Sequence, residues 1–257
     1  MTINPLVSIV IPTRDSNPET NSCFKICLES INRQTYPNIQ IIIVCEGYER
    51  SKQRNIGISK ATGKYIYSLD DDHYIPPTLI SQAVSTLENE PFDFLCIDNR
   101  FLNSDILLQQ VRRIEREIAL EGFFHIAGCF FRRDILPSNP FNESLNAGED
   151  YELHSKLLSQ GYTFKRLSEI YATHLKEPTS LSQVIKQNIY YGKSIRTYLK
   201  PVEGTSITKT ERMISVQPFR ISYFKNFHRF NPQQFIYFLV YQYIRYISAL
   251  IGMINHK

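Results

Sequence analysis

The chain has 257 residues, of which 42% are hydrophobic and 21% charged, so it is long enough for one large globular domain with a sizeable core. Its net charge of +4 is mild and no dense Lys/Arg block precedes the last third, which argues against a nucleic-acid partner. The five cysteines include no Cys-x-x-Cys pair. They predict neither a disulfide framework nor a zinc site, and they favour a reducing, cytoplasmic setting.

The first quarter of the chain alternates short apolar runs with helical patterns. The runs Leu6–Ile11 and Ile39–Val44 are too short and too β-branched for helices, and they predict buried strands. Between them, Asn17 as a cap and Pro18 at the first helical position predict the start of a helix. A basic segment, Arg50–Lys60, leads to a third apolar run. The order strand, helix, strand, helix, strand is typical of a doubly wound α/β half-domain.

The third apolar run, Tyr65–Leu69, stops abruptly in three consecutive aspartates, Asp70, Asp71 and Asp72. They fall at the carboxyl end of a predicted strand, where open α/β sheets bind ligands. Three adjacent carboxylates repel one another unless a cation takes up the charge, and hard oxygen ligands favour Mg²⁺ or Mn²⁺. The alternative is a solvated acidic turn that caps a helix starting at Pro77. The surrounding sequence favours metal binding.

Patterns in the middle of the chain predict further elements of both kinds. They are, in chain order, a helix carrying Ile80–Leu87, a strand over Phe92–Ile97, a polar helix around Ile114–Ile118, a strand over Phe123–Phe131, a loop and helix over Asn146–Gly161, two short strands over Thr163–Leu167 and Ile170–His174, and a helix over Ser180–Leu199. Gly161 is expected to end its helix as the C′ residue.

The segment Phe235–Ile254 is apolar enough to suggest a membrane, but Gln242 and Arg245 lie near its middle. An arginine there costs about 2.5–3.5 kcal/mol or more, so a clean transmembrane span is disfavoured. With the basic residues that precede it, the segment predicts a helix held against the cytoplasmic face of a membrane. The alternative is that its apolar face packs on the rest of the chain or forms a homodimer.

Five stretches together resemble glycosyltransferase family 2 enzymes of the GT-A fold, over roughly Val7–Leu181. They are VSIVIPTRD, LESINRQTYPNIQIIIVCEG, QRNIGISKATGKYIYSLDDD, NAGEDYELHSKLLSQG and THLKEPTSL, in the family's order and spacing. The resemblance implies an α/β, Rossmann-like, mostly parallel sheet flanked by helices, here with a helical C-terminal extension. It implies a catalytic domain of residues 1–200, a linker over residues 201–218 and a C-terminal helical segment over residues 219–257.

The resemblance also implies a reaction. A metal-dependent, inverting enzyme would move a sugar from a nucleoside diphosphate donor, with a UDP-sugar favoured, to a hydroxyl of a lipid-linked or cell-surface glycan. The alternative is a non-catalytic sugar-nucleotide-binding or scaffold protein of the same fold. A haloacid-dehalogenase-like phosphatase would also combine strand-end aspartates with Mg²⁺. It needs them after the first strand, where this chain has Pro12-Thr13-Arg14-Asp15.

Matching the family's motifs residue by residue assigns the metal site and the base. Asp72, the last Asp of the family's Asp-any-Asp motif, is implied as a metal ligand, Asp70 would face the ribose or base, and Asp71 would have a supporting role. His174 matches a position where related enzymes often carry a histidine near the metal. Asp150, in a Glu-Asp pair at a predicted helix start, matches the catalytic base. The helix amino end is expected to lower its pKa, and a purely structural acid is the alternative.

The nucleotide contacts match the family less closely. Thr13 and Arg14 match the loop that packs on the base, and Arg54 matches an arginine near the diphosphate, although a surface role is the alternative for both arginines. Family members usually end the second strand in two aspartates, whereas this chain has Cys45-Glu46. Glu46 is expected to accept a hydrogen bond from a uracil N–H. This departure leaves the nucleotide open.

Overall fold

The computed structural model describes residues 4–121, 129–200 and 221–255. Its strands are β1 (Val7–Pro12), β2 (Ile39–Val44), β3 (Tyr65–Ser68), β4 (His73–Tyr74), β5 (Phe94–Phe101), β6 (Phe130–Arg132) and β7 (Phe164–His174). Its α-helices are α1 (Ser22–Asn32), α2 (Arg50–Lys60), α3 (Leu79–Asn89), α4 (Leu107–Glu121), α5 (Glu149–Ser159), α6 (Leu181–Tyr198), α8 (Ile221–Lys225) and α9 (Pro232–Asn255), with short 3₁₀ turns η2 (Arg133–Ile135) and η3 (Phe227–Arg229).

All seven described strands form one sheet, in the order β2-β1-β3-β6-β5-β7-β4. Strand β1 pairs in parallel with both β2 and β3, which confirms the predicted doubly wound half. Beyond β3 the sheet becomes mixed, because β6 runs antiparallel to β3 and β5, and β4 runs antiparallel to β7. Strands β5 and β7 are again parallel.

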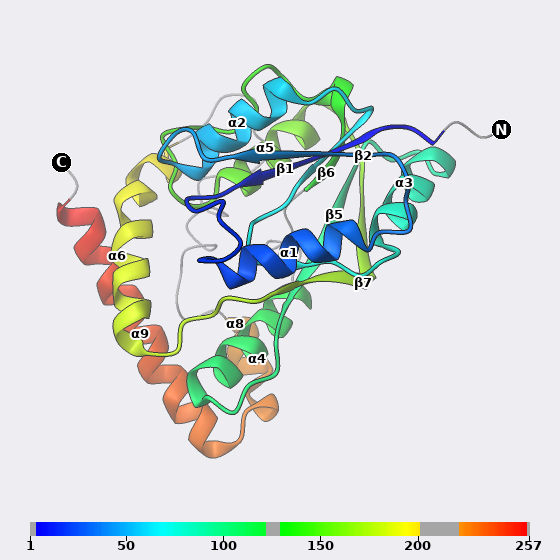
Figure 1. Ribbon diagram of the computed structural model, residues 1–257. Helices are drawn as coiled ribbons and strands as arrows, with labels where there is room; N and C mark the ends of the chain where they lie inside the picture. Colours follow the sequence, from blue (N-terminus) through cyan, green and yellow to red (C-terminus); the bar gives the residue numbers. More distant parts are fainter. Residues whose placement is uncertain (1–3, 122–128, 201–220, 256–257) are drawn as a thin grey trace.

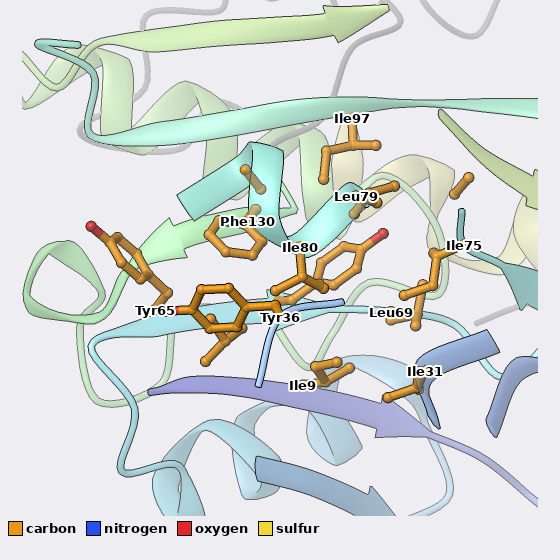
Figure 2. Packing of buried hydrophobic residues seen from close by; sticks show 14 of the residues in the cluster. Ile9, Ile31, Tyr36, Tyr65, Leu69, Ile75, Leu79, Ile80, Ile97 and Phe130 are labelled. Atoms are coloured by element: carbon orange, nitrogen blue, oxygen red, sulfur yellow. The ribbon is translucent and has the colours of Figure 1, made fainter. Parts of the chain in front are cut away.

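Helices cover the sheet on both faces, which explains why every residue of β1 is buried (Figure 1). On one face Ile9 belongs to a cluster with Phe24 of α1 and Ile80 of α3, part of which is seen in Figure 2. On the other face Val10 packs in a cluster with Leu153 of α5. Burial on both sides accounts for β1 being apolar throughout rather than alternating.

Helix α1 begins at Ser22, so the predicted start at Asn17 is wrong. The cap is Asn21, whose side-chain oxygen accepts a hydrogen bond from the backbone N–H of Phe24. Asn17 instead accepts a hydrogen bond from the N–H of Glu19, in a turn that precedes the helix. Asn favours both kinds of local bond, and the sequence alone did not distinguish them.

Two further predictions differ from the structure near the site. The aspartates are followed by the short strand β4, and α3 begins at Leu79 rather than Pro77. The two strands expected between Thr163 and His174 are one strand, β7, with a register shift opposite Ile97 and Asp98 of β5. A strand was expected over Phe123–Phe131, and the structure shows its last part as β6, which begins at Phe130. Residues 122–128 lie outside the described residues, and so does the linker predicted over 201–218.

Helix α9 packs along α6 and against α4, and Figure 1 shows α6 and α9 side by side. Two glycines permit this approach: a Cβ on Gly192 would lie 2.2 Å from the carbonyl oxygen of Ala249, and a Cβ on Gly252 would lie 2.1 Å from that of Ile189. The inner face of α9 therefore packs on the chain itself. Helix α9 is also the one described helix long and apolar enough to cross a membrane, by length and composition.

Candidate functional site

A cavity of about 440 Å³ opens where the aspartates after β3 meet the first turn of α5. Its walls come from the sheet and from α2, α4, α6 and α9, so the C-terminal helix helps to line it. Of the residues predicted for the site, it is lined by Arg54, Asp70, Asp150 and His174. The structure therefore brings the strand-end acid and the predicted base, which are 80 positions apart in sequence, to one cavity.

Asp70 is held by two arginines of α2. Its Oδ1 lies 2.8 Å from Nη2 of Arg54, and its Oδ2 lies 3.8 Å from Nη1 of the half-exposed Arg50. Burial would raise the pKa of Asp70, but the guanidinium groups of Arg50 and Arg54 outweigh burial and hold that pKa far below its usual range. Asp70 is therefore a fixed negative charge.

Arg54 connects the two acidic clusters of the site. Its Nη1 donates a hydrogen bond of 2.6 Å to Glu149 of α5, its Nη2 bonds Asp70, and its guanidinium lies 5.1 Å from the ring centre of Phe141. The residue is 7% exposed. A buried guanidinium shared between two carboxylates fixes the spacing of β3 and α5. The sequence predicted that Arg54 lies near the diphosphate, whereas its contacts in the structure are with these two carboxylates.

Asp71 faces the loop after β1. Its Oδ2 accepts hydrogen bonds of 2.6 Å from the hydroxyl of Thr13 and 3.4 Å from the side-chain amide of Asn21. Burial raises its pKa. Thr13 is itself buried, and its hydrogen bond to Asp71 connects the end of β1 to the loop that carries the aspartates.

Asp72 lies beside two histidines, one of which the sequence did not single out. Its Oδ1 is 3.0 Å from Nδ1 of His73 in β4, and its Oδ2 is 3.5 Å from Nε2 of His174 at the end of β7. Strands β4 and β7 pair His73 directly with His174, so the sheet fixes this arrangement. One ligand atom from each of the three residues lies within 4.8 Å of the others.

The chemistry of this cluster suits a divalent cation. The Nδ1 atom of His73, which faces Asp72, is buried and makes no well-directed hydrogen bond within the described residues, whereas Nδ1 of His174 faces Glu177. Burial lowers the pKa of His174 to about 4, so its ring is neutral near pH 7 and can donate a lone pair. Burial would raise the pKa of Asp72, but His73 and His174 outweigh it, so the carboxylate stays ionised. One carboxylate with two imidazoles fits Mn²⁺ better than Mg²⁺.

Asp150 stands in the first turn of α5, after Gly148 in the left-handed conformation at φ +83°. A Cβ at Gly148 would lie 2.7 Å from the ring of Tyr198 in α6, so both conformation and space require glycine. Burial first, and then the neighbouring Glu149, raise the pKa of Asp150 to about 6, although Arg54 lowers it. The expected lowering at the helix amino end is therefore wrong, because burial outweighs the helix dipole.

Arg14 and Glu46 lie at the exposed ends of β1 and β2. The guanidinium of Arg14 lies 5.2 Å from the ring centre of Tyr48, which is 75% exposed. Glu46 is exposed and its carboxylate accepts a hydrogen bond of 2.8 Å from Lys60. Neither residue lines the cavity of the aspartates, so any contact with a nucleobase would be made at its outer edge.

Sequence reasoning missed His73, Arg50 and Glu149 as members of the site. A histidine directly after the aspartates was a signal for the first, since imidazole and carboxylate groups both bind divalent transition metals. The ion pair of Arg54 with Glu149 had no local signal, because the two residues are 95 positions apart.

A model of glycosyl transferase family 2 matches residues 46–137, which include the three aspartates. The chain is 21% identical over 226 residues to the uncharacterized glycosyltransferase EpsJ of Bacillus subtilis, across 70% of this chain and 64% of that protein's length. Among solved structures, a mannosyltransferase of Pyrobaculum calidifontis, in complex with GDP-Man and Mn²⁺, superposes with a TM-score of 0.67 at 13% identity, covering 100% of this chain and 89% of that one.

A second solved structure, TarS 1-349 of S. aureus in complex with UDP, superposes with a TM-score of 0.50 at 15% identity. It covers 96% of this chain and 89% of the TarS chain. The two structures share the α/β architecture described above, with a mixed sheet between helices, which is the GT-A fold. The family model and the curated relative support a glycosyltransferase of family 2, and the two solved structures support the GT-A fold.

Proposed function

We propose that this enzyme transfers a sugar from a nucleoside diphosphate donor to a hydroxyl group, with inversion at the anomeric carbon and with the help of Mn²⁺ or Mg²⁺. The observation that carries the proposal is that a cluster suited to a cation, around Asp72, and a half-buried carboxyl group, Asp150, flank the same group of strand-end residues. Two similar structures hold GDP-Man with Mn²⁺ and UDP, which supports a donor of this class.

The metal would be held by Asp72 and His174, with His73 as a third ligand, and when bound it would neutralise charge on the leaving diphosphate. Arg50 of α2 adds a positive charge at this place. Its side chain is half exposed and its Nη1 lies 3.8 Å from Asp70, so its remaining donors can bind a phosphate oxygen. Arg54 is less suited to that contact, because both of its terminal nitrogens already bind carboxylates.

Asp150 would accept the proton of the acceptor hydroxyl as the new bond forms. A carboxylate with a pKa of about 6 is still mostly ionised at pH 7 and is a stronger base than an ordinary aspartate. Arg54 and Gly148 hold it in position from two sides: the arginine through Glu149, and the glycine through the turn that starts α5.

The nucleotide base would lie against Arg14 and Tyr48, beside Thr13, with the ribose near Asp70. We propose UDP as the nucleotide because the longer side chain of Glu46, at the end of β2, can reach a uracil N–H after release from Lys60. GDP is the second candidate, because a similar structure holds GDP-Man.

We further propose a lipid-linked or cell-surface glycan as acceptor, met at the cytoplasmic face of a membrane. The outward face of α9 carries a continuous apolar row without a charged residue; its exposed members are Ile236, Val240, Tyr243, Ile247, Ile251 and Ile254. The one arginine of the helix, Arg245, points inward and binds Glu115 at 2.5 Å, which removes the cost that argued against a membrane.

Charge favours a lipid surface over a second copy of the chain. The described residues of α6, α8 and α9 contain no Asp or Glu. Exposed cations lie on and just after α6, beside α9: Lys186, Lys193, Arg196 and Lys200. An anionic bilayer would attract these cations, whereas a symmetric dimer would bring two like-charged rows together. A homodimer is therefore the second candidate.

The reaction is tested by donor turnover. Purified full-length protein is incubated with Mn²⁺ or Mg²⁺ and a panel of UDP- and GDP-sugars, and release of nucleoside diphosphate is measured. We expect metal-dependent hydrolysis of one donor class, with UDP-sugars turned over faster than GDP-sugars. Equal and metal-independent release from all donors, or no release from any, would exclude the proposed reaction.

A further inference from the structure

The metal cluster is connected to the C-terminal helix by a series of buried polar contacts. His174 presents Nε2 towards Asp72 and Nδ1 towards Glu177, whose Oε1 lies 3.2 Å away. The other carboxylate oxygen of Glu177 accepts a hydrogen bond of 2.5 Å from Nε of Arg112 in α4. Nη1 of the same guanidinium donates a hydrogen bond of 2.7 Å to the hydroxyl of Tyr241 in α9.

Each member of this series is fixed on more than one side. The side chain of Glu177 is 8% exposed, that of Arg112 is 14% exposed, and Tyr241 is fully buried. The guanidinium of Arg112 also lies 5.6 Å from the ring centre of Phe101, which in turn meets the ring of His174 edge-on at 5.5 Å. Because a guanidinium is planar, holding its Nη1 edge at Tyr241 also sets the direction of its Nε–H towards Glu177.

We infer that Glu177, Arg112 and Tyr241 are positioning residues through which α9 sets the orientation of the His174 ring, so that Nε2 faces the cation. A ligating histidine is commonly held by its second nitrogen on a carboxylate, and Glu177 stands at that place. The inference rests on the proposed function, because it takes the cluster at Asp72 as the metal site. It gives α9 a role in the site that is separate from membrane contact.

The test measures Mn²⁺ affinity, by electron paramagnetic resonance of free Mn²⁺, with the full-length protein and saturating UDP or GDP. Glu177→Gln should raise the Kd for Mn²⁺ by about 10-fold to 100-fold, as other partners of metal ligands do. Tyr241→Phe keeps the buried ring but removes the hydroxyl, and it should raise the Kd by about 3-fold to 10-fold.

Two controls separate positioning from general loss of stability. Tyr223→Phe removes another buried hydroxyl of the same cluster, one that donates to Glu115, and should leave the Kd within about 2-fold of wild type. In the Glu177→Gln background, Tyr241→Phe should change the Kd by less than about 2-fold, because Gln has one acceptor oxygen and cannot accept from both Arg112 and His174, so the series is already interrupted there.

The outcomes distinguish this inference from the proposed function. If wild-type protein binds no Mn²⁺ with either nucleotide, the metal site and the inference both fail. If wild type binds Mn²⁺ but Tyr241→Phe leaves the Kd unchanged, or Tyr223→Phe raises it equally, only the inference fails. A readout without metal is the ring tautomer of His174 by ¹⁵N NMR: we expect Nδ1–H in wild type and a mixture in Tyr241→Phe, and identical spectra would overturn the inference.

Discussion

At the scale of single residues, Asp72 is the side chain on which the proposed reaction depends most. Asp72→Asn removes the charge that a cation would neutralise but keeps the size of the side chain. We expect almost complete loss of sugar transfer and weaker nucleotide binding in the presence of Mn²⁺. Thermal unfolding should change little, because the residue lies in the loop between β3 and β4.

The matched control is Asp71→Asn, which removes a neighbouring charge that faces Thr13 instead of the histidines. It should retain far more activity than Asp72→Asn. A near wild-type rate for Asp72→Asn with metal present would show that the assignment of the ligand is wrong.

Asp150→Asn tests the base. A general base acts in the transition state, so transfer should fall by about 10²-fold or more while donor affinity stays nearly unchanged. Both quantities are obtained from initial rates and from titration of the donor. Equal losses of rate and of donor affinity would instead indicate a role in metal binding or in folding.

The raised pKa of Asp150 predicts a pH dependence. The base works when ionised, so kcat/KM for the acceptor should rise with pH and level off above its pKa, which is about 6. Glu149 contributes to raising this pKa by charge repulsion. Glu149→Gln should therefore move the acidic limb of the profile to lower pH, as measured between about pH 4.5 and 8. A limb that stays in place would mean that another group titrates.

At the scale of elements, the contact between α6 and α9 depends on two glycines. Gly252→Ala would place a methyl group 2.1 Å from a backbone oxygen of α6, which cannot move aside as a side chain can. Overpacking of this kind typically costs about 1–3 kcal/mol of unfolding free energy. Urea unfolding measures it, with Ile254→Ala on the exposed face of α9 as control, expected within about 0.5 kcal/mol of wild type. Equal stability of the two variants would refute the close contact.

At the scale of the whole molecule, the outer face of α9 predicts binding to anionic membranes. Truncation before α9 would not test this cleanly, because the helix also contributes Tyr241 to the interior. A better variant replaces four exposed residues of the row with serine: Ile236, Val240, Ile247 and Ile251. Wild type should float with vesicles containing phosphatidylglycerol at low salt, and less so as salt rises, whereas this variant should not float.

The control for that experiment carries serine at four exposed isoleucines elsewhere on the surface: Ile26, Ile41, Ile43 and Ile106. It should float like wild type. If wild type stays unbound at low salt and proves to be a stable dimer that the α9 variant disrupts, the outer face of α9 is a subunit interface and the membrane proposal fails.

Sequence by itself determined the order of the central elements and the chemistry at the strand ends. Short β-branched runs favour buried strands, and parallel strands joined by helices bring their carboxyl ends to one edge, so Thr13 and the aspartates are expected to lie together. The aspartates and the Glu-Asp pair are likewise visible in the sequence, because each is a local run at the end of a strand or the start of a helix. These features depend on neighbours in the chain.

Only the tertiary structure decided how far each of those residues is buried and which partners it has. Burial reversed the expected pKa shift of Asp150, and pairing of β4 with β7 brought His73 to Asp72. The ion pair of Arg54 with Glu149, 95 positions away in sequence, holds the arginine inside the protein between two carboxylates. The periodicity of α9 could not show which of its faces is covered, since both carry large apolar groups. Packing on α4 and α6 settled this by turning Arg245 to Glu115, because the buried carboxylate of Glu115 needs a partner that no local pattern reveals.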